Sequence, residues 1–113
     1  MKRCYVAGAY RAPTESGIRQ NIERARAVAE RMWAKGYAAF CPHLNSAFMG
    51  GVCPDHYFLE GDLEWLRFAS LVVLVDGWEQ SKGTQAEIAY AHRMHIPVLT
   101  EAEADALPNE EVS

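Results

Sequence analysis

A short stretch around residue 81 combines a hydroxyl, a glycine and a carboxylate at a spacing that suits chemistry on an anion. Ser81 and Gly83 follow the apolar run 71–75, and Glu87 comes one turn later among small and apolar residues. An apolar β-branched run, a glycine-containing turn and then a helical pattern predict a strand, a loop and a helix of an α/β protein. The start of such a helix offers free backbone N–H groups to an anion. A carboxylate at the position of Glu87 requires a chemical reason.

Other side chains with chemical potential follow two further expected strands. The first strand ends at Gly8, with Tyr10 and Arg11 directly after it, and His43 follows the second. Ligands of parallel α/β sheets bind beyond the carboxyl ends of the strands. Arg11 could hold a phosphate or carboxylate there through two hydrogen bonds. The alternative is ordinary: Tyr10 and Arg11 as a surface pair, and His43 as a polar loop residue.

A second carboxylate, Asp62, is expected on a helix over residues 57–68, near the edge of its buried face. It is either an exposed helix residue or a group that reaches a pocket. Two carboxylates beside an anion site suit cleavage of a glycosidic bond, in which one attacks the anomeric carbon while an acid assists the leaving group. The chain has no P-loop, no dinucleotide fingerprint and no serine-hydrolase elbow.

These residues must be positioned by alternating strands and helices. Strands joined by helices through short turns form right-handed βαβ units with parallel strands. The expected fold is therefore α/β, a three-layer flavodoxin-like or Rossmann-like sandwich with a parallel sheet of four to five strands. A long irregular loop is typical of a lid or binding loop. The expected strands are 3–8, 37–41, 71–75 and 96–99, the expected helices are 16–35, 57–68, 83–94 and 101–107, and the loop covers 44–56.

Composition limits the remaining possibilities. A chain of 113 residues suits one domain over 1–113, with an acidic and flexible tail over 101–113. The net charge of −4 argues against binding of nucleic acid, and no apolar stretch is long enough for a membrane span. Three cysteines without a CxxC pair predict a cytoplasmic protein. Cys53 and His56 have no second pair to complete a zinc site, so no metal or cofactor is expected.

Several of these residues together resemble a known superfamily. The order Tyr5-x-x-Gly8-x-x-Arg11, then Asp62, then Ser81-x-Gly83-x-x-x-Glu87 resembles the nucleoside 2-deoxyribosyltransferase-like superfamily. The stretch 77–87 is similar to a small-domain, DUF4406-like group found in phages and bacteria that has no assigned activity. The resemblance extends over about residues 4–98, and its most specific part is the Ser-x-Gly-x-x-x-Glu stretch after an apolar strand.

The resemblance implies roles for these residues. Glu87 would be the nucleophile that attacks C1′ and holds a covalent glycosyl intermediate, while Asp62 would orient the sugar or protonate the departing base. Transferases of free nucleosides tend to carry an acid six residues before the nucleophile, where this chain has Ser81. Relatives with serine there hydrolyse nucleoside 5′-monophosphates. The remaining substrate-binding positions implied are Tyr5, Gly8, Tyr10, Arg11, His43, Trp78 and Gly83.

The role of Trp78 is left undecided, and Ala9 departs from the pattern of the superfamily. Trp78 either stacks on the base or only caps its strand. Relatives that cleave monophosphates often carry a small hydroxyl residue after the first-strand glycine, where this chain has Ala9, so one phosphate contact would be lost.

The resulting hypothesis is hydrolysis of the N-glycosidic bond of a nucleotide, a small-molecule substrate. The alternatives are base exchange between nucleosides, a nucleotide-binding or sensing module without catalysis, and a structural phage protein in which Glu87 merely pairs with Lys82 or Arg93. A homodimer or higher homo-oligomer is also expected, because a domain this small would expose large apolar side chains on its helices. Those side chains are Trp65, Phe68, Tyr90 and Met94.

Overall fold

A four-stranded parallel sheet organises the protein, which is described here by a computed structural model over residues 1–111. The strands lie in the order β2-β1-β3-β4. The two central strands, β1 and β3, are apolar and almost entirely buried, as expected of parallel strands covered on both faces. The strands are β1 (Arg3–Ala7), β2 (Ala38–Phe40), β3 (Leu71–Leu74) and β4 (Val98–Thr100).

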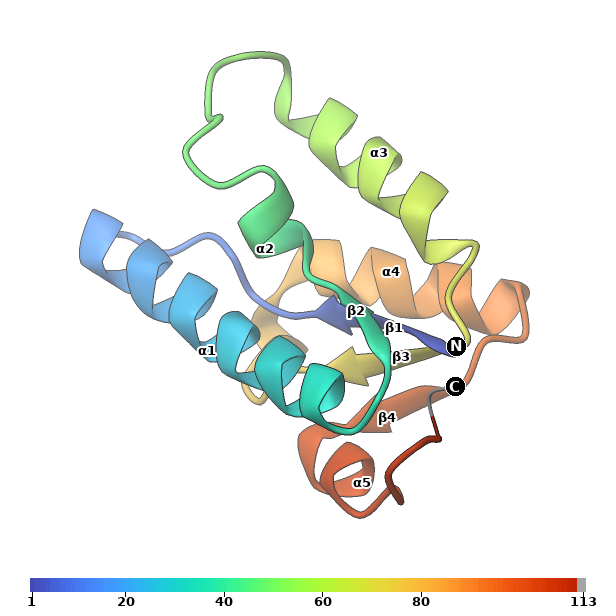
Figure 1. The fold of residues 1–113 in the computed structure, drawn as a ribbon. Helices are drawn as coiled ribbons and strands as arrows, with labels where there is room; N and C mark the ends of the chain where they lie inside the picture. The colour runs from blue at the N-terminus through green and yellow to red at the C-terminus, as the bar shows by residue number, and fades with distance from the viewer. Residues whose placement is uncertain (112–113) are drawn as a thin grey trace.

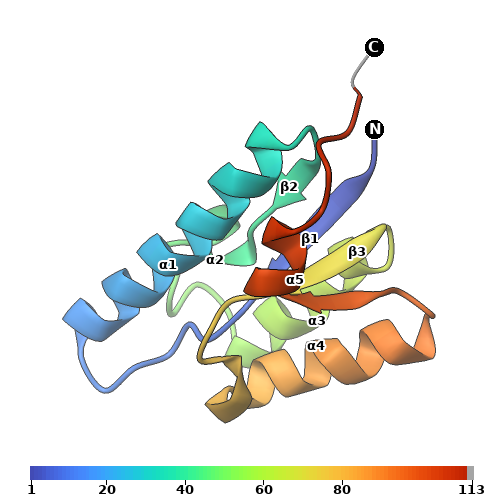
Figure 2. The same ribbon diagram turned by 90° about the horizontal axis from the view of Figure 1, so that it is seen from below.

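Helices cover both faces of this sheet (Figure 1, Figure 2). On one face, α1 (Glu15–Ala34) and α5 (Glu101–Asp105) pack on a core that includes Met32 and Val73. On the other, α3 (Asp55–Leu66) and α4 (Lys82–Arg93) pack on a core that includes Leu66 and Val72. The expected α/β three-layer sandwich with a parallel sheet is therefore confirmed, with four strands.

The strand order creates a crevice at one edge of the sheet. From β1 the chain crosses to β2 on one side through α1, and later enters β3 on the other side. The connections that leave β1 and β3 therefore diverge to opposite faces, which opens a ligand crevice beyond the carboxyl ends of these strands. Gly8, Tyr10, Arg11 and His43, which follow β1 and β2 in the sequence, line this crevice.

Some element boundaries differ from the expected ones. The short helix α2 (Pro42–Asn45) occupies the start of the loop expected over 44–56, because proline is well placed in a first helical turn. The last strand begins at Val98, after Pro97. A short 3₁₀ helix, η1 (Trp78–Gln80), precedes α4.

The acidic end does not behave as the solvated tail that its composition suggested. Glu101 and Asp105 both pair with Arg31 of α1, at 2.7 and 3.1 Å. Glu110 pairs with Lys2 at 2.8 Å and accepts a hydrogen bond from the Tyr37 hydroxyl. The acidic residues thus tie the end of the chain to α1 and to the start of β1 as far as residue 110. The last two residues of the expected tail, 112 and 113, lie outside the described residues.

Exposed apolar side chains are present on the helices. Trp65, Phe68 and Met94 are exposed, whereas Tyr90 is half-buried and packs on the α3–α4 core. Association of the chain with itself remains a prediction. Within residues 1–111, no helix has the length and apolar character needed to cross a membrane.

Gly8 should be essential for packing at the end of β1. A Cβ added there would lie 2.7 Å from Cβ of Val75, at the start of the turn after β3. We expect Gly8→Ala to lower the free energy of unfolding by about 1–3 kcal/mol, because overpacking forces the two strand ends apart. Denaturant titration measures the change. Gly61→Ala is the matched control: this position in α3 has open space around it, so the free energy should stay the same or rise by up to about 1 kcal/mol. Equal effects at both positions would contradict the packing argument.

Candidate active site

A cleft of about 930 Å³ opens beyond the carboxyl ends of β1 and β3. Its walls come from the loop between β1 and α1, from α2, from α3 and from the first turns of α4. The side chains in these walls include most of the residues singled out from the sequence: Gly8, Tyr10, Arg11, His43, Asp62, Ser81, Gly83 and Glu87. The fold therefore brings together residues that lie up to 79 positions apart, from 8 to 87.

Glu87 lies in the floor of this cleft and is almost completely buried, with 6% of its surface exposed. The Tyr5 hydroxyl donates a hydrogen bond to its Oε2. Burial raises the pKa of Glu87 from 4.5 to about 7, the Tyr5 hydrogen bond opposes this rise, and the charge of Asp62 adds to it. No cation pairs with Glu87 in the described part of the chain, including Lys82 and Arg93.

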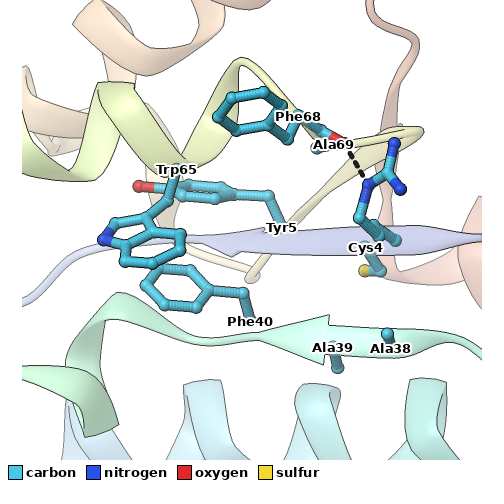
Figure 3. A pocket seen from close by; sticks show the side chains of 9 residues that line it. Cys4, Tyr5, Ala38, Ala39, Phe40, Trp65, Phe68 and Ala69 are labelled. Atoms are coloured by element: carbon cyan, nitrogen blue, oxygen red, sulfur yellow. Dashed lines mark hydrogen bonds between the residues drawn. The ribbon is translucent and has the colours of Figure 1, made fainter.

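Tyr5 is held by a stack of aromatic rings that reaches the surface. Its ring stacks on Phe40 of β2 at 5.8 Å, and Phe40 stacks on Trp65 of α3 at 5.4 Å. Figure 3 shows the rings of Tyr5, Phe40 and Trp65 next to one another. The stack lines a second, apolar pocket of about 410 Å³ next to the edge strand β2. Because the Tyr5 side chain is buried and packed, its hydroxyl is fixed toward Glu87.

Asp62 is the second carboxylate of the cleft. It lies on α3 and is half-buried, and burial raises its pKa from 3.8 to about 6. Asp62 and Glu87 line the same cleft, and the charge of Asp62 raises the pKa of both Glu87 and Tyr5. Two carboxyl groups with raised pKa values can share roles near neutral pH, one ionised as a nucleophile and the other protonated as an acid.

Ser81 is the N-cap of α4. Its Oγ accepts hydrogen bonds from the backbone N–H of Thr84 at 3.2 Å and from Thr84 Oγ1 at 2.9 Å. A hydroxyl has two acceptor positions and one donor. With both acceptor positions filled, Ser81 retains only its proton to offer, which suits a ligand that accepts hydrogen bonds. The first backbone N–H groups of α4, at Lys82 and Gly83, line the same wall and add a partial positive charge.

Arg11 also lines the cleft, but its guanidinium is already engaged. It forms an exposed ion pair with Asp55, the first residue of α3. The loop that carries Arg11 is fixed by Asn21, whose Nδ2 donates to the carbonyl oxygens of Tyr10 and Arg11 at 3.0 and 3.3 Å. The sequence alone had suggested no such role for Asn21, and no signal pointed to Asp55.

His43 and Tyr10 also line the cleft. His43 is buried, and its Nε2 lies 2.9 Å from the carbonyl oxygen of Ala9, so Nε2–H donates to that carbonyl. Burial lowers the pKa of His43, which favours the neutral imidazole. Its Nδ1 has no hydrogen-bond partner within residues 1–111. The Tyr10 ring packs edge-on against the imidazole at 5.6 Å.

Trp78 does not belong to the cleft. It is half-buried and packs on the core between the sheet, α3 and α4, whose members include Tyr5 and Leu74. Of its two expected roles, the structure favours capping of the strand. Phe48, in the long loop that is typical of a lid or binding loop, is 86% exposed and does not line the cleft either. Residues 1–111 also hold no group of three or more His, Cys, Asp or Glu side chains suited to a metal ion.

Comparisons with known proteins agree with this fold. A family model described as a domain of unknown function, DUF7768, matches residues 2–101; the sequence had suggested a DUF4406-like group. A solved structure, a 2-deoxyribosyltransferase from the psychrotolerant bacterium Bacillus psychrosaccharolyticus, is similar with a TM-score of 0.60 and 17% sequence identity. The match covers 98% of this chain and 77% of that one. The nucleoside 2-deoxyribosyltransferase-like fold is therefore confirmed. No curated protein matches the sequence.

The raised pKa of Glu87 makes a prediction about stability. A carboxyl whose pKa is higher in the folded state favours folding while it is protonated, and this contribution is lost as pH rises through the folded-state pKa. For Glu87 the loss extends from about pH 4.5 to about 7, and a shift of that size corresponds to roughly 3 kcal/mol. Glu87→Gln keeps an acceptor for the Tyr5 hydroxyl but cannot ionise.

The stability of Glu87→Gln relative to the wild type should therefore grow by roughly 2 kcal/mol between pH 5 and 8. Urea titrations of both proteins across this range measure the difference. Burial lowers the pKa of His43, so His43 changes the stability with pH in the direction opposite to Glu87. Because both proteins contain His43, its contribution cancels from the difference. Glu79→Gln removes an exposed carboxylate of η1 and should leave the pH dependence as it is. A constant difference between Glu87→Gln and the wild type would show that Glu87 is not perturbed.

Proposed function

The chain belongs to the DUF7768 family, and we propose that it hydrolyses the N-glycosidic bond of a (deoxy)nucleoside 5′-monophosphate through a covalent glycosyl intermediate on Glu87. The observation that carries this proposal is the buried carboxylate of Glu87, oriented by the Tyr5 hydroxyl and accompanied by Asp62 in the floor of a cleft. A protein that only binds phosphate gains nothing from an unpaired carboxylate at this place, because it repels the ligand.

The reaction would proceed by double displacement. An oxygen of Glu87 attacks C1′, the bond between C1′ and the base nitrogen breaks, and the base leaves with the proton of Asp62. Water then attacks C1′, Asp62 takes a proton from that water, and the Glu87 carboxylate is released. Two inversions give a sugar with retained configuration. The pKa values of Glu87 and Asp62 lie at about 7 and about 6, so the pair holds protons close to neutral pH. The first step uses the form in which Asp62 carries the proton and Glu87 is ionised, and the higher pKa of Glu87 means that the proton must first pass from Glu87 to Asp62.

Tyr5 would act on the nucleophile rather than on the substrate. Its hydroxyl hydrogen bond favours the ionised form of Glu87 and fixes one carboxylate oxygen. The other oxygen is left to attack. The sequence had suggested Tyr5 as a substrate-binding residue, and its burial makes it a positioning residue.

The 5′-phosphate would bind at the start of α4. Ser81 has only its proton left to donate, the N–H groups at Lys82 and Gly83 are free of intrahelical partners, and Arg11 supplies a full positive charge. An aspartate in place of Ser81 would repel a phosphate dianion, whereas serine does not. Tyr10 and His43, which also line the cleft, would contact the base or the sugar.

Base release is the direct test. We expect the wild-type protein to liberate a free base from at least one nucleoside 5′-monophosphate and Glu87→Ala to abolish this release, because the covalent intermediate forms on the carboxylate that this variant removes. Chromatography of a panel of nucleotides measures the base, and mass spectrometry of the quenched protein should find a sugar phosphate attached to the peptide that contains Glu87. Glu79→Gln is the control and should release base at the wild-type rate.

The same panel separates the alternatives. Exchange of the base alone, as in a transferase, would appear as a new nucleoside or nucleotide when a second free base is added, with no release of base when it is left out. A binding module would release no base, while nucleotides would still raise its melting temperature. A structural protein would show neither release nor stabilisation. Each of these results would contradict hydrolysis.

The preference for a 5′-phosphate should depend on Ser81. Aspartate and asparagine are both good N-cap residues, so Ser81→Asp and Ser81→Asn preserve the start of α4. Ser81→Asp should raise KM for the nucleotide by at least about tenfold, because two like charges are brought within a few ångströms, and it should leave cleavage of the corresponding nucleoside unchanged or faster. Ser81→Asn should change KM far less. Equal effects of the two variants on nucleotide KM would show that no phosphate sits beside Ser81.

A further inference from the structure

The arginine best placed to bind a phosphate is held by an acid of the protein itself. Arg11 comes from the loop after β1, and Asp55 comes from the start of α3, so their ion pair joins two walls of the cleft. Both residues line the cleft in which the nucleotide would bind. The side chains are 76% and 67% exposed, so the pair is accessible to a ligand from solution.

The two partners differ in how firmly they are placed. The backbone at Arg11 is fixed by Asn21, which receives a further hydrogen bond from Arg24. Asp55 follows the irregular segment 46–54, and Pro54 before it provides no side-chain cap for α3. The backbone at Arg11 is thus held in place by a side chain, while the first turn of α3 has no such support, so Asp55 is the partner that we expect to withdraw.

An exposed ion pair of this kind is weak, because water and dissolved salt screen the attraction between its charges. A phosphate dianion carries a larger charge than a carboxylate and also accepts two parallel hydrogen bonds from a guanidinium. A bound 5′-phosphate can therefore displace Asp55 from Arg11 at small cost. After the reaction, Asp55 is available to take Arg11 back from the phosphate of the sugar product.

We propose that Asp55 is an internal competitor for Arg11: it occupies the arginine in the empty cleft, yields it to the 5′-phosphate, and reclaims it as the sugar phosphate leaves. This role rests on the proposed function, because it assumes a phosphate at Arg11. Asp55 lowers the affinity of the cleft for the substrate and for the sugar phosphate product alike. The benefit is faster release of the product, because the product keeps the phosphate that Arg11 binds in the substrate.

Binding of 2-deoxyribose 5-phosphate tests the competition without any turnover, because this probe has no glycosidic bond. Asp55→Asn keeps the size of the side chain and removes its charge. We expect Asp55→Asn to tighten the dissociation constant of the probe by about two- to fivefold at low salt, the factor that corresponds to a weak exposed ion pair. NMR titration that follows the Arg11 Nε–H signal measures this constant and reports the change of partner directly. Uncharged 2-deoxyribose should bind both proteins equally.

Two further variants identify the cause. Glu60→Gln removes an exposed acid of the same helix that does not line the cleft, and it should leave the dissociation constant as it is. In the Arg11→Gln background, binding should be weaker, and adding Asp55→Asn should no longer change it. This double-mutant cycle separates competition for Arg11 from simple repulsion between Asp55 and the phosphate.

Three results would overturn the proposal. Asp55→Asn could bind the probe no better than the wild type, it could tighten binding equally with Arg11→Gln present, or Arg11→Gln could bind as well as the wild type. Failure of the proposed function is separate: it would appear as an absence of base release from nucleotides even though the cycle between Arg11 and Asp55 behaves as expected.

Discussion

The interaction on which the site depends is a hydrogen bond from a neutral group to a buried carboxylate. Glu87 is buried at the base of the cleft and receives the Tyr5 hydroxyl instead of a cation. A cation would lower the pKa of Glu87 far more and would also neutralise its charge. A phenol orients the carboxylate and leaves most of its basicity, so that burial keeps its pKa at about 7. Such a group costs stability and is retained where its reactivity is used.

The fold makes this arrangement possible by placing the two partners on different elements. Tyr5 lies in the middle of the central strand β1, and Glu87 lies in the second turn of α4, which packs on the same face of the sheet. The stack of Phe40 and Trp65 prevents the Tyr5 ring from turning away. Because that stack ends at an exposed indole beside the edge strand, the orientation of Glu87 depends on residues that never touch the cleft.

The sequence predicted the parts of the site that are tied to local patterns. Glu87 and Ser81 could be found because a strand, a turn and a helix follow one another within a few residues, and Asp62 because a carboxylate at the edge of an apolar face is unusual. Asp55 could not be found, since its partner Arg11 lies 44 positions away. The sequence left two roles for Trp78, because the side chain of an aromatic residue after a strand can turn either toward the core or toward the cleft. The acidic end looked solvated because its cations, Lys2 and Arg31, come from the other end of the chain.

The charges of the cleft explain how an acidic site can accept an anion. Its walls contain three carboxyl groups, Asp55, Asp62 and Glu87, against the cations Arg11 and Lys82. The raised pKa values of Asp62 and Glu87 reduce this excess, because the pair retains a proton close to neutral pH. A phosphate bound near α4 would raise both pKa values further, since a nearby negative charge disfavours ionisation. In the proposed reaction, substrate binding would therefore strengthen the hold of the Asp62–Glu87 pair on its proton, and the departing base requires that this proton lie on Asp62.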